Sequence, residues 1–355
     1  MEIAILVALA FGLAFFLTPL FKRLARNKGI VDEPNARKVH NSSTPLLGGA
    51  AVYLAFWSGV GILLLFNGGG EEILGLFLGS TLITFLGLYD DIKGLSYKAK
   101  FAGQFAAAFI LLAYNIRIEF ITFPFQEMVF LGTFMVPLTL LWVVGITNAV
   151  NLIDGVDGLA AGVSVIAGVV VFSLTWGEFP YITILVLILA GAALGFLPHN
   201  FYPARIFLGD AGSLFLGFML AAFSIMGVAK QATLTTLIVP VLVFGLPIAD
   251  TFFAIWRRYR SRRPLFQADK GHIHHRLMAL GLTTRQTVVI LYLISVYFGA
   301  AAIVFNRFPS IYIFLIPLIF ALFLLGIKRL DTLKEILSEI PVQALSSKQQ
   351  SDKKD

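Results

Sequence analysis

The sequence predicts an all-α polytopic membrane protein, on two observations. Of its 355 residues, 58% are hydrophobic and only 13% are charged, and the mean hydropathy is +0.87. A soluble domain carries about 25% charged residues, so this chain has too little polar surface to cover its apolar volume in water. The apolar residues also occur in successive segments of the length that a helix needs to cross a bilayer. The lack of cysteine excludes disulfide frameworks and thiol nucleophiles.

About eleven apolar segments are predicted to be transmembrane helices. They cover 3–20, 46–66, 72–89, 101–114, 130–147, 159–176, 181–197, 212–228, 234–255, 286–305 and 310–327. The first lacks the basic start and the small-residue cleavage site of a removable signal peptide, so we expect it to be retained. Residues 115–127 are too short and irregular to cross and are expected to form an extended hairpin outside the bilayer.

The chain is divided into one integral membrane domain at 1–327 and a cytoplasmic tail at 328–355. Apolar residues recur at three- and four-residue spacing at the start of the tail, which predicts a short amphipathic helix at the membrane interface. Pro341 would end this helix. The polar residues near the C-terminus are too hydrophilic to pack and are expected to be disordered.

Basic residues define the orientation of the predicted spans. If eleven spans alternate in direction, 24 of the 27 Lys and Arg residues fall on one side. This excess marks the cytoplasmic side, which places the N-terminus outside and the C-terminus inside. The net charge of +7 is therefore a topology signal and does not indicate a nucleic-acid partner. Because all five histidines fall on the same side, we expect the active site on the cytoplasmic face of a plasma membrane.

Two adjacent carboxylates end the third predicted span. Asp90 and Asp91 are followed by Lys98 and Lys100. Adjacent acids at a helix C-terminus repel each other and oppose the helix dipole, so they indicate a bound cation or a proton-transfer role. A solvated helix end with lysines as interface anchors is the alternative interpretation.

The run Asn-Ala-Val-Asn-Leu-Ile-Asp-Gly-Val-Asp-Gly-Leu-Ala at 148–160 is the most specific pattern in the chain. Its polar residues recur every three positions, so they share one face where the backbone is helical. These residues are Asn148, Asn151, Asp154 and Asp157. Asp157 and Gly158 stand where the next span begins, beside free backbone N–H groups. A calcium loop is excluded because the ligand scheme with its terminal Glu is absent.

A third polar run, at 198–213, ends in Gly-Asp-Ala-Gly-Ser at the start of the eighth predicted span. A carboxylate at a helix N-terminus would repel a phosphate brought to the same place, and a hard cation such as magnesium resolves this conflict. Asp210 is therefore a candidate magnesium ligand. Phe207, three residues earlier, is either a packing residue or a ring on which a nucleobase stacks.

The longest cytoplasmic connection carries two basic patterns. Five arginines within 257–263 are typical of positive-inside anchoring and contact with anionic headgroups. The following histidine-rich run contains His272, His274, His275 and Arg276. Neither cysteine nor a His-x-x-x-His spacing supports a zinc site. We therefore expect this run to donate hydrogen bonds to phosphate and sugar hydroxyls.

Together these patterns resemble the polyprenyl-phosphate N-acetylhexosamine-1-phosphate transferases. The resemblance covers 1–327 and rests on Thr44-Pro-Leu-Leu-Gly-Gly, Asp90-Asp91, the run at 148–160, Phe207-Leu-Gly-Asp-Ala-Gly-Ser and Gly271-His-Ile-His-His-Arg. The last of these is similar to the WecA/TagO branch, which uses UDP-N-acetylglucosamine, and differs from the MraY branch. The resemblance implies a bacterial membrane enzyme that transfers N-acetylglucosamine-1-phosphate from UDP-GlcNAc to polyprenyl (undecaprenyl) phosphate. It would release UMP in the first membrane step of a cell-envelope glycan pathway.

The resemblance also implies a role for each candidate residue. The catalytic residues would be Asp90, Asp91, Asp154, Lys98 and Lys100. Those that hold Mg²⁺, for which Mn²⁺ is a substitute, would be Asp210 and Asn151. Those at the nucleotide would be Asp157, Asn200, Phe207 and Gly158. Those at the sugar and phosphates would be His272, His274, His275, Arg276, Lys38 and His40.

Two other functions stay open at this point. One is the same chemistry with a different UDP-N-acetylhexosamine, and the other is a transporter or flippase. Transporters bind substrate near the bilayer midplane between repeated halves, whereas here the acids lie at span ends and the sequence has no internal repeat. Asp250, about one turn inside the ninth predicted span, is the exception and a functional candidate. Direct attack by the lipid phosphate, a covalent Asp intermediate and a homodimer are also left open.

Overall fold

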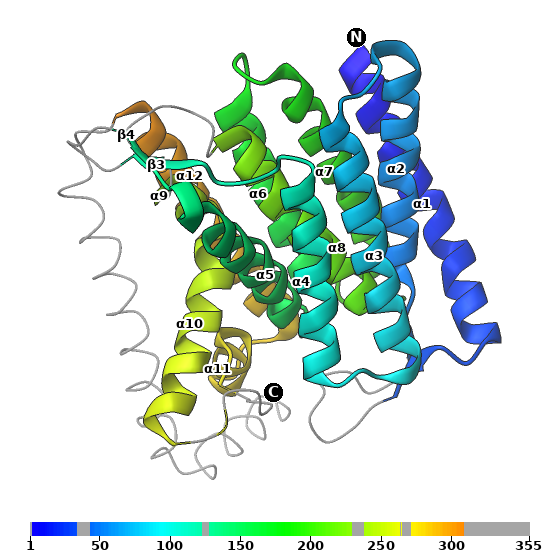
Figure 1. The fold of residues 1–355 in the computed structure, drawn as a ribbon. Helices are drawn as coiled ribbons and strands as arrows, with labels where there is room; N and C mark the ends of the chain where they lie inside the picture. The colour runs from blue at the N-terminus through cyan, green and yellow to red at the C-terminus, as the bar shows by residue number, and fades with distance from the viewer. Residues whose placement is uncertain are drawn as a thin grey trace, which may run out of the picture.

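The computed structural model describes residues 2–33, 43–122, 128–228, 238–262, 264 and 271–308. In these ranges the chain forms a helical bundle with two short antiparallel strand pairs (Figure 1). Seven helices of this described part are long and apolar enough to cross a membrane. They are α1 (Glu2–Asn27), α2 (Gly48–Asn67), α3 (Glu71–Lys93), α5 (Met135–Ile153), α7 (Pro180–Asn200), α8 (Gly209–Phe223, continued by a π-helical turn at Ser224–Val228) and α12 (Thr284–Arg307). The structure thus agrees with a mostly helical, polytopic membrane protein.

The other helices are shorter. They are α4 (Tyr97–Ala113), α6 (Leu159–Thr175), α9 (Ile238–Val243), α10 (Gly245–Arg260) and α11 (Ile273–Ala279), with a 3₁₀ turn at Gly132–Phe134. The predicted spans at 101–114 and 159–176 coincide with α4 and α6. The predicted span at 310–327 and the tail at 328–355 lie outside the described residues. The count of eleven spans and their orientation stay predictions.

The ninth predicted span, at 234–255, is not one continuous helix where the structure describes it. The chain leaves helical geometry at Phe244, between α9 and α10, and α10 then runs on to Arg260. Pro247 explains the break, because a proline has no N–H to donate to the carbonyl of Val243 one turn earlier.

The two strand pairs mark opposite ends of the bundle. Strands β3 (Phe120–Thr122) and β4 (Met128–Phe130) are antiparallel, which confirms the extended hairpin expected here, although β4 begins just past the predicted limit of 127. Strands β1 (Val31–Asp32) and β2 (Thr44–Pro45) pair near the start of α2. Figure 1 shows the β3–β4 pair at the end of the bundle opposite to the α3–α4 connection.

Helix α8 is the centre of the bundle. In the part that could span the membrane, 94% of the residues are buried. Helices α2, α3, α5, α6 and α7 pack around it. Helix α3 approaches the start of α8 very closely at Gly87, where an added Cβ would overlap the Cα of Ala211. Only glycine permits this approach. The polar end of α3 is therefore fixed over the N-terminus of α8, which positions the acids described next.

Candidate active site

A cavity of about 440 Å³ lies where α3 and α5 end and α6 and α8 begin. This volume is within the range typical of small-molecule sites. Most of the predicted acids and part of the predicted nucleotide site line it. The predicted residues in its wall are Asp90, Asp91, Asp154, Asp157, Asn200, Phe207, Asp210 and His275. The fold thus joins four sequence patterns that are far apart along the chain.

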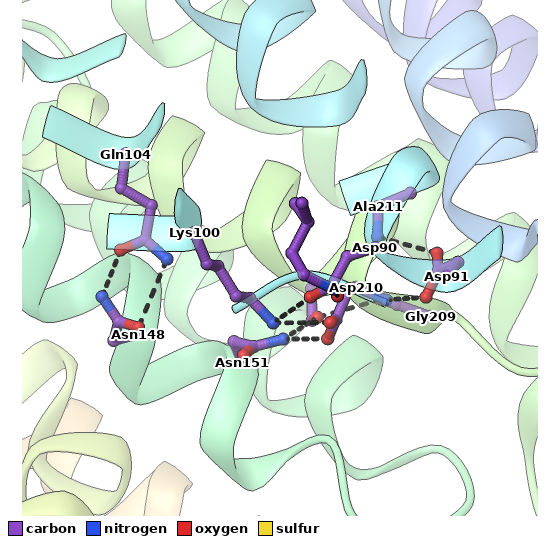
Figure 2. Close-up of polar contacts among 11 residues, drawn as sticks. Asp90, Asp91, Lys100, Gln104, Asn148, Asn151, Gly209, Asp210 and Ala211 are labelled. Carbon is purple, nitrogen blue, oxygen red and sulfur yellow. Dashed lines mark hydrogen bonds and ion pairs between the residues drawn. The ribbon is translucent and has the colours of Figure 1, made fainter. Parts of the chain in front are cut away.

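The centre of the site is an ammonium group between two carboxylates (Figure 2). Lys100 on α4 places its Nζ 2.9 Å from Oδ2 of Asp90 and 2.5 Å from Oδ2 of Asp210. The other oxygen of Asp90 accepts a hydrogen bond from the backbone N–H of Leu95 at 2.6 Å. One cation shared by two acids leaves this cluster with a net negative charge, which attracts a further cation.

Asn151 adds an amide to this cluster. Its Nδ2 donates to Oδ1 of Asp210 at 2.6 Å and to Oγ of Ser213 at 2.8 Å. A side-chain amide carries a carbonyl oxygen as well as an NH₂ group, and carbonyl oxygens are among the ligands of hard cations. The two predicted magnesium ligands, Asp210 and Asn151, are therefore direct neighbours.

The donor atoms of this cluster fit magnesium. In the described ranges, no group of three or more His, Cys, Asp or Glu side chains is arranged to hold a metal ion alone. Magnesium needs no such cage, because it is usually bound by one or two carboxylates and keeps its other positions for water and substrate phosphates. Asp90 and Asp210 in the cavity wall supply that number of carboxylates, and the Asn151 amide is hydrogen-bonded to Asp210 beside them.

Asp91 has a different place from its neighbour Asp90. Its two carboxylate oxygens accept hydrogen bonds from the backbone N–H groups of Asp210 at 2.8 Å and of Ala211 at 3.1 Å (Figure 2). These N–H groups begin α8 and have no partner within the helix. Asp91 therefore caps α8 and is stabilised by the positive end of its dipole. This contact explains how two adjacent acids can end α3. The catalytic role of Asp91 stays a prediction.

Gly209 must be glycine for this cap to form. Its φ is +71°, and an added Cβ would lie 2.6 Å from Oδ2 of Asp91. Gly209→Ala is therefore expected to lower the free energy of unfolding by about 1–3 kcal/mol, through backbone strain and displacement of the Asp91 carboxylate. The measurement is the thermal unfolding of the purified protein in detergent.

Gly145→Ala is the matched control for this prediction. Gly145 lies inside helix α5, and an added Cβ there would meet no atom within 4 Å. Alanine is favoured over glycine in a helix, so this variant should unfold at an unchanged or a higher temperature. Equal unfolding temperatures for Gly209→Ala and the unchanged protein would contradict the described contact with Asp91.

Asp154 lies in the acidic wall of the cavity. Burial raises the pKa of its carboxyl well above the usual value, and the negative charges of Asp210, Asp91 and Asp157 raise it further. Four acids thus compete for few positive charges in one cavity. Such a field favours a divalent cation and opposes a phosphate that arrives without one.

The predicted nucleotide residues hold two loops together. Asn200 is 2% exposed, and its Oδ1 accepts from the N–H of Gly158 at 3.1 Å while its Nδ2 donates to the carbonyl of Ile206 at 3.1 Å. Asp157 accepts from the N–H of Ala204 at 2.8 Å through Oδ2. The turn after α5 and the segment between α7 and α8 are thereby tied together, and the half-buried Phe207 lies at the cavity wall.

The histidine-rich run is attached to α10 through Asp250. Oδ2 of Asp250 lies 2.7 Å from Nδ1 of His272, and Oδ1 accepts from the N–H of Ile273 at 2.8 Å. The His274 ring packs between its neighbours, with ring centroids 5.8 Å from His272 and 4.3 Å from His275. Burial lowers the pKa of His274 to about 3, and His275 adds to this effect, so His274 is neutral at physiological pH. Of the described residues in this run, His275 lines the cavity.

The remaining predicted residues lie elsewhere. Lys98 is exposed on the first turn of α4, and Arg276 is half-buried on α11. Lys38 and His40 fall outside the described residues. The roles predicted for all of these residues stay predictions.

Several site residues escaped the sequence reasoning. Gln104, one turn after Lys100 on α4, exchanges hydrogen bonds with the amide of Asn148 (Figure 2). Asp32 lines the cavity from β1. Tyr292 on α12 donates to the carbonyl of Gly158 at 2.6 Å. The i, i+4 spacing of Lys100 and Gln104 was a usable signal, whereas no local pattern indicates Asp32 or Tyr292.

Comparison with known proteins identifies relatives of this chain. Residues 73–228 match the family model "Glycosyl transferase family 4". A probable undecaprenyl-phosphate N-acetylglucosaminyl 1-phosphate transferase of Bacillus subtilis is 42% identical over 86% of both chains. A decaprenyl-phosphate N-acetylglucosaminephosphotransferase of Mycobacterium tuberculosis is 35% identical over 86% of this chain and 83% of its own length. An undecaprenyl-phosphate alpha-N-acetylglucosaminyl 1-phosphate transferase of Escherichia coli is 28% identical over 88% of both.

Proposed function

Since the chain belongs to glycosyl transferase family 4, we propose that it transfers N-acetylglucosamine-1-phosphate from UDP-N-acetylglucosamine to a polyprenyl phosphate. UMP is the second product. The names of the relatives support the donor sugar and the lipid acceptor. The observation that carries the proposal is the pair of acids Asp90 and Asp210, which line one cavity at an end of the helical bundle and share the ammonium group of Lys100. There, a membrane-bound phosphate can meet a soluble nucleotide sugar.

The proposed reaction is a single displacement. An oxygen of the lipid phosphate forms a bond to the β-phosphorus of the UDP-sugar, and the bond from that phosphorus to the oxygen of UMP breaks, so that UMP leaves with the electron pair. Asp90 accepts the proton of the lipid phosphate. Phosphoryl transfer depends mainly on positioning and charge neutralisation, and no covalent enzyme intermediate is required.

The chain's own groups position both substrates in this proposal. Phe207 stacks on the uracil and Asp157 accepts a hydrogen bond from it, with Asn200 at the same subsite. His275 and Arg276 face the phosphates and the acetamido sugar. Lys100 moves from its two carboxylates toward the phosphoryl oxygens as these approach. Magnesium, when bound at Asp210 and Asn151, would neutralise charge on the pyrophosphate.

Transport is disfavoured by the contacts of Asp250. This acid was the one sequence feature that resembled an intramembrane substrate site, and it is bound to His272 and to the backbone of Ile273. A buried carboxylate with two close donors has a structural partner and needs no transported ion to balance it.

An activity assay tests the proposed function. The purified protein is incubated with polyprenyl phosphate, magnesium and a panel of UDP-sugars, and UMP is measured. UDP-N-acetylglucosamine should give the fastest release, and a chelator of divalent cations should abolish it. Fastest release with another UDP-N-acetylhexosamine would overturn the donor sugar, and release of no UMP with any sugar would overturn the reaction, as a transporter or flippase predicts.

The proposed enzyme acts on the cytoplasmic side of a bacterial plasma membrane, and labelling can test this orientation. Ser96 is exposed at the N-terminus of α4, and Gly69 lies in the connection between α2 and α3 at the other end of the bundle. Because the chain has no cysteine, Ser96→Cys and Gly69→Cys each introduce a single thiol. An impermeant thiol reagent added to intact cells should label Gly69→Cys and leave Ser96→Cys unlabelled until the cells are opened. The reverse pattern would overturn the orientation.

A further inference from the structure

A second cavity lies on the flank of the bundle, between α1 and α7. It measures about 680 Å³ and shares no lining residue with the candidate active site in the described part of the chain. Its wall is mostly apolar, with Phe11 from α1 and Leu194, Leu197 and Phe201 from α7 and the segment that follows. Arg205 is the charged residue that lines it. Figure 1 shows α1 on the outside of the bundle. Phe11, Leu194 and Tyr202 in the cavity wall are exposed.

Basic side chains gather beside this cavity. Lys22, near the end of α1, lies close enough to Arg26 and Arg205 for both guanidinium groups to repel its charge. Lys22 and Arg205 also lie close enough to His199, at the end of α7, to repel a positive charge on its ring. Within the described ranges, Lys22, Arg26 and Arg205 form no ion pair with a carboxylate. Like charges from separate segments repel one another unless an anion lies between them. This cluster therefore has the charge to hold one.

We propose that Lys22, Arg26 and Arg205 form a binding site for an anionic phospholipid. The phosphate of the lipid lies among the three cations, and its acyl chains lie in the apolar cavity beside Arg205. Basic pockets between membrane helices are known to hold such headgroups. A soluble anion would use the charges alone and would leave the apolar wall exposed.

The lipid site adjoins the segment that carries the predicted nucleotide residues. Between α7 and α8, the backbone N–H of Arg205 donates to the carbonyl of His199 at 2.9 Å, and the N–H of Ala204 donates to Asp157 at 2.8 Å. Phe207 follows directly at the active-site cavity. A lipid bound to Arg205 therefore stabilises the segment that contacts the nucleotide. This consequence depends on the proposed function, whereas the lipid site itself does not.

Lipid retention tests the site without any assay of activity. The full chain is purified in detergent containing phosphatidylglycerol and an excess of phosphatidylcholine, and retained lipid is counted by native mass spectrometry. The variant Lys22→Gln/Arg205→Gln should bind phosphatidylglycerol about 30-fold more weakly and retain correspondingly less of it, the effect expected from two lost headgroup contacts. Leu194→Trp, which takes up part of the cavity and keeps every charge, should lower retention as well.

The control variant is Lys93→Gln/Arg285→Gln, which removes the same charge at exposed positions on α3 and α12. It should retain phosphatidylglycerol within a factor of about two of the unchanged protein, as surface substitutions usually do. Equal retention in both double variants, or equal retention of the two phospholipids, would overturn the site. Displacement of phosphatidylglycerol by millimolar inorganic phosphate, by equimolar polyprenyl phosphate or by a second copy of the chain would overturn the proposed occupant.

A kinetic experiment separates this proposal from the proposed function. In vesicles, phosphatidylglycerol should lower the KM for UDP-N-acetylglucosamine in the unchanged protein and leave it unaltered in Lys22→Gln/Arg205→Gln. If the retention results are as expected and no UMP is released, the lipid site stands and the proposed function fails. If UMP is released and retention does not depend on the cluster, the opposite holds.

Discussion

Asp210→Asn is expected to reduce the rate of UMP release by about 10³-fold or more, equivalent to about 4 kcal/mol of transition-state stabilisation. Asp210 contacts both Lys100 and Asn151, and it stands at the start of α8 where the pyrophosphate would arrive. The amide keeps the size of the side chain and removes its charge. Lys100 then keeps one carboxylate partner, and the proposed magnesium site loses its strongest ligand.

Two comparisons make this result specific. Glu119→Gln changes an exposed carboxylate of the β3–β4 region to an amide and should leave the rate within a factor of about two. The unfolding temperature of Asp210→Asn should be close to that of the unchanged protein. Substantial activity in Asp210→Asn at saturating magnesium would contradict both the metal role and the importance of the shared Lys100.

Asp90→Asn distinguishes the roles of the two acids that share Lys100. If Asp90 accepts the proton of the lipid phosphate, its loss matters less when the phosphate is already doubly ionised. A phosphate monoester loses its second proton near pH 6. The rate of UMP release by Asp90→Asn, relative to the unchanged protein, should therefore rise between about pH 6 and pH 8. The relative rate of Asp210→Asn should stay low across this range, because a metal ligand is needed at either pH.

The sequence predicted which polar residues meet, whereas tertiary contacts decide which partner each of them has. The adjacency of Asp90 and Asp91 indicated one shared task, yet Asp91 caps α8 because Gly87 lets α3 approach Ala211. No local rule places two helices that closely. Lys98 and Lys100 were treated alike, although the buried positions Gln104, Ala107 and Leu111 continue the face of Lys100 at helical spacing. That periodicity is visible in the sequence and is sufficient to separate the two lysines.

Local signals were sufficient where the backbone alone decides the structure. The alternating segment before β4 predicted the hairpin, and Pro247 carried a readable signal for the break between α9 and α10. The partner of Asp250 could not be predicted in the same way. His272 is 22 positions away, and the two meet only because α10 and the start of α11 pack together. Pairing across such a connection depends on the whole fold.

The second large effect is expected at Asp250, which acts through His272. The carboxylate accepts a hydrogen from Nδ1 of His272 and thus fixes both the orientation of the ring and the tautomer. In Asp250→Asn, one of the two donors, His272 Nδ1 or the N–H of Ile273, must face an NH₂ group. The segment from His272 to His275 then shifts. A misplacement of about 1 Å costs about 10²-fold in rate, so we expect a fall of that size in kcat and a smaller change in KM.

A double-mutant cycle tests whether Asp250 works through His272. Asp250→Asn should cause little further loss of UMP release in a His272→Ala background, because residues that act as a unit are not additive. Thr251→Val is the matched control on the same helix. The Thr251 hydroxyl is buried and has no hydrogen-bond partner among the described residues, so its removal should leave activity unchanged and stability equal or higher. Full additivity of the Asp250 and His272 losses would show that Asp250 contributes by another route, and α10 would then need a contact with substrate of its own.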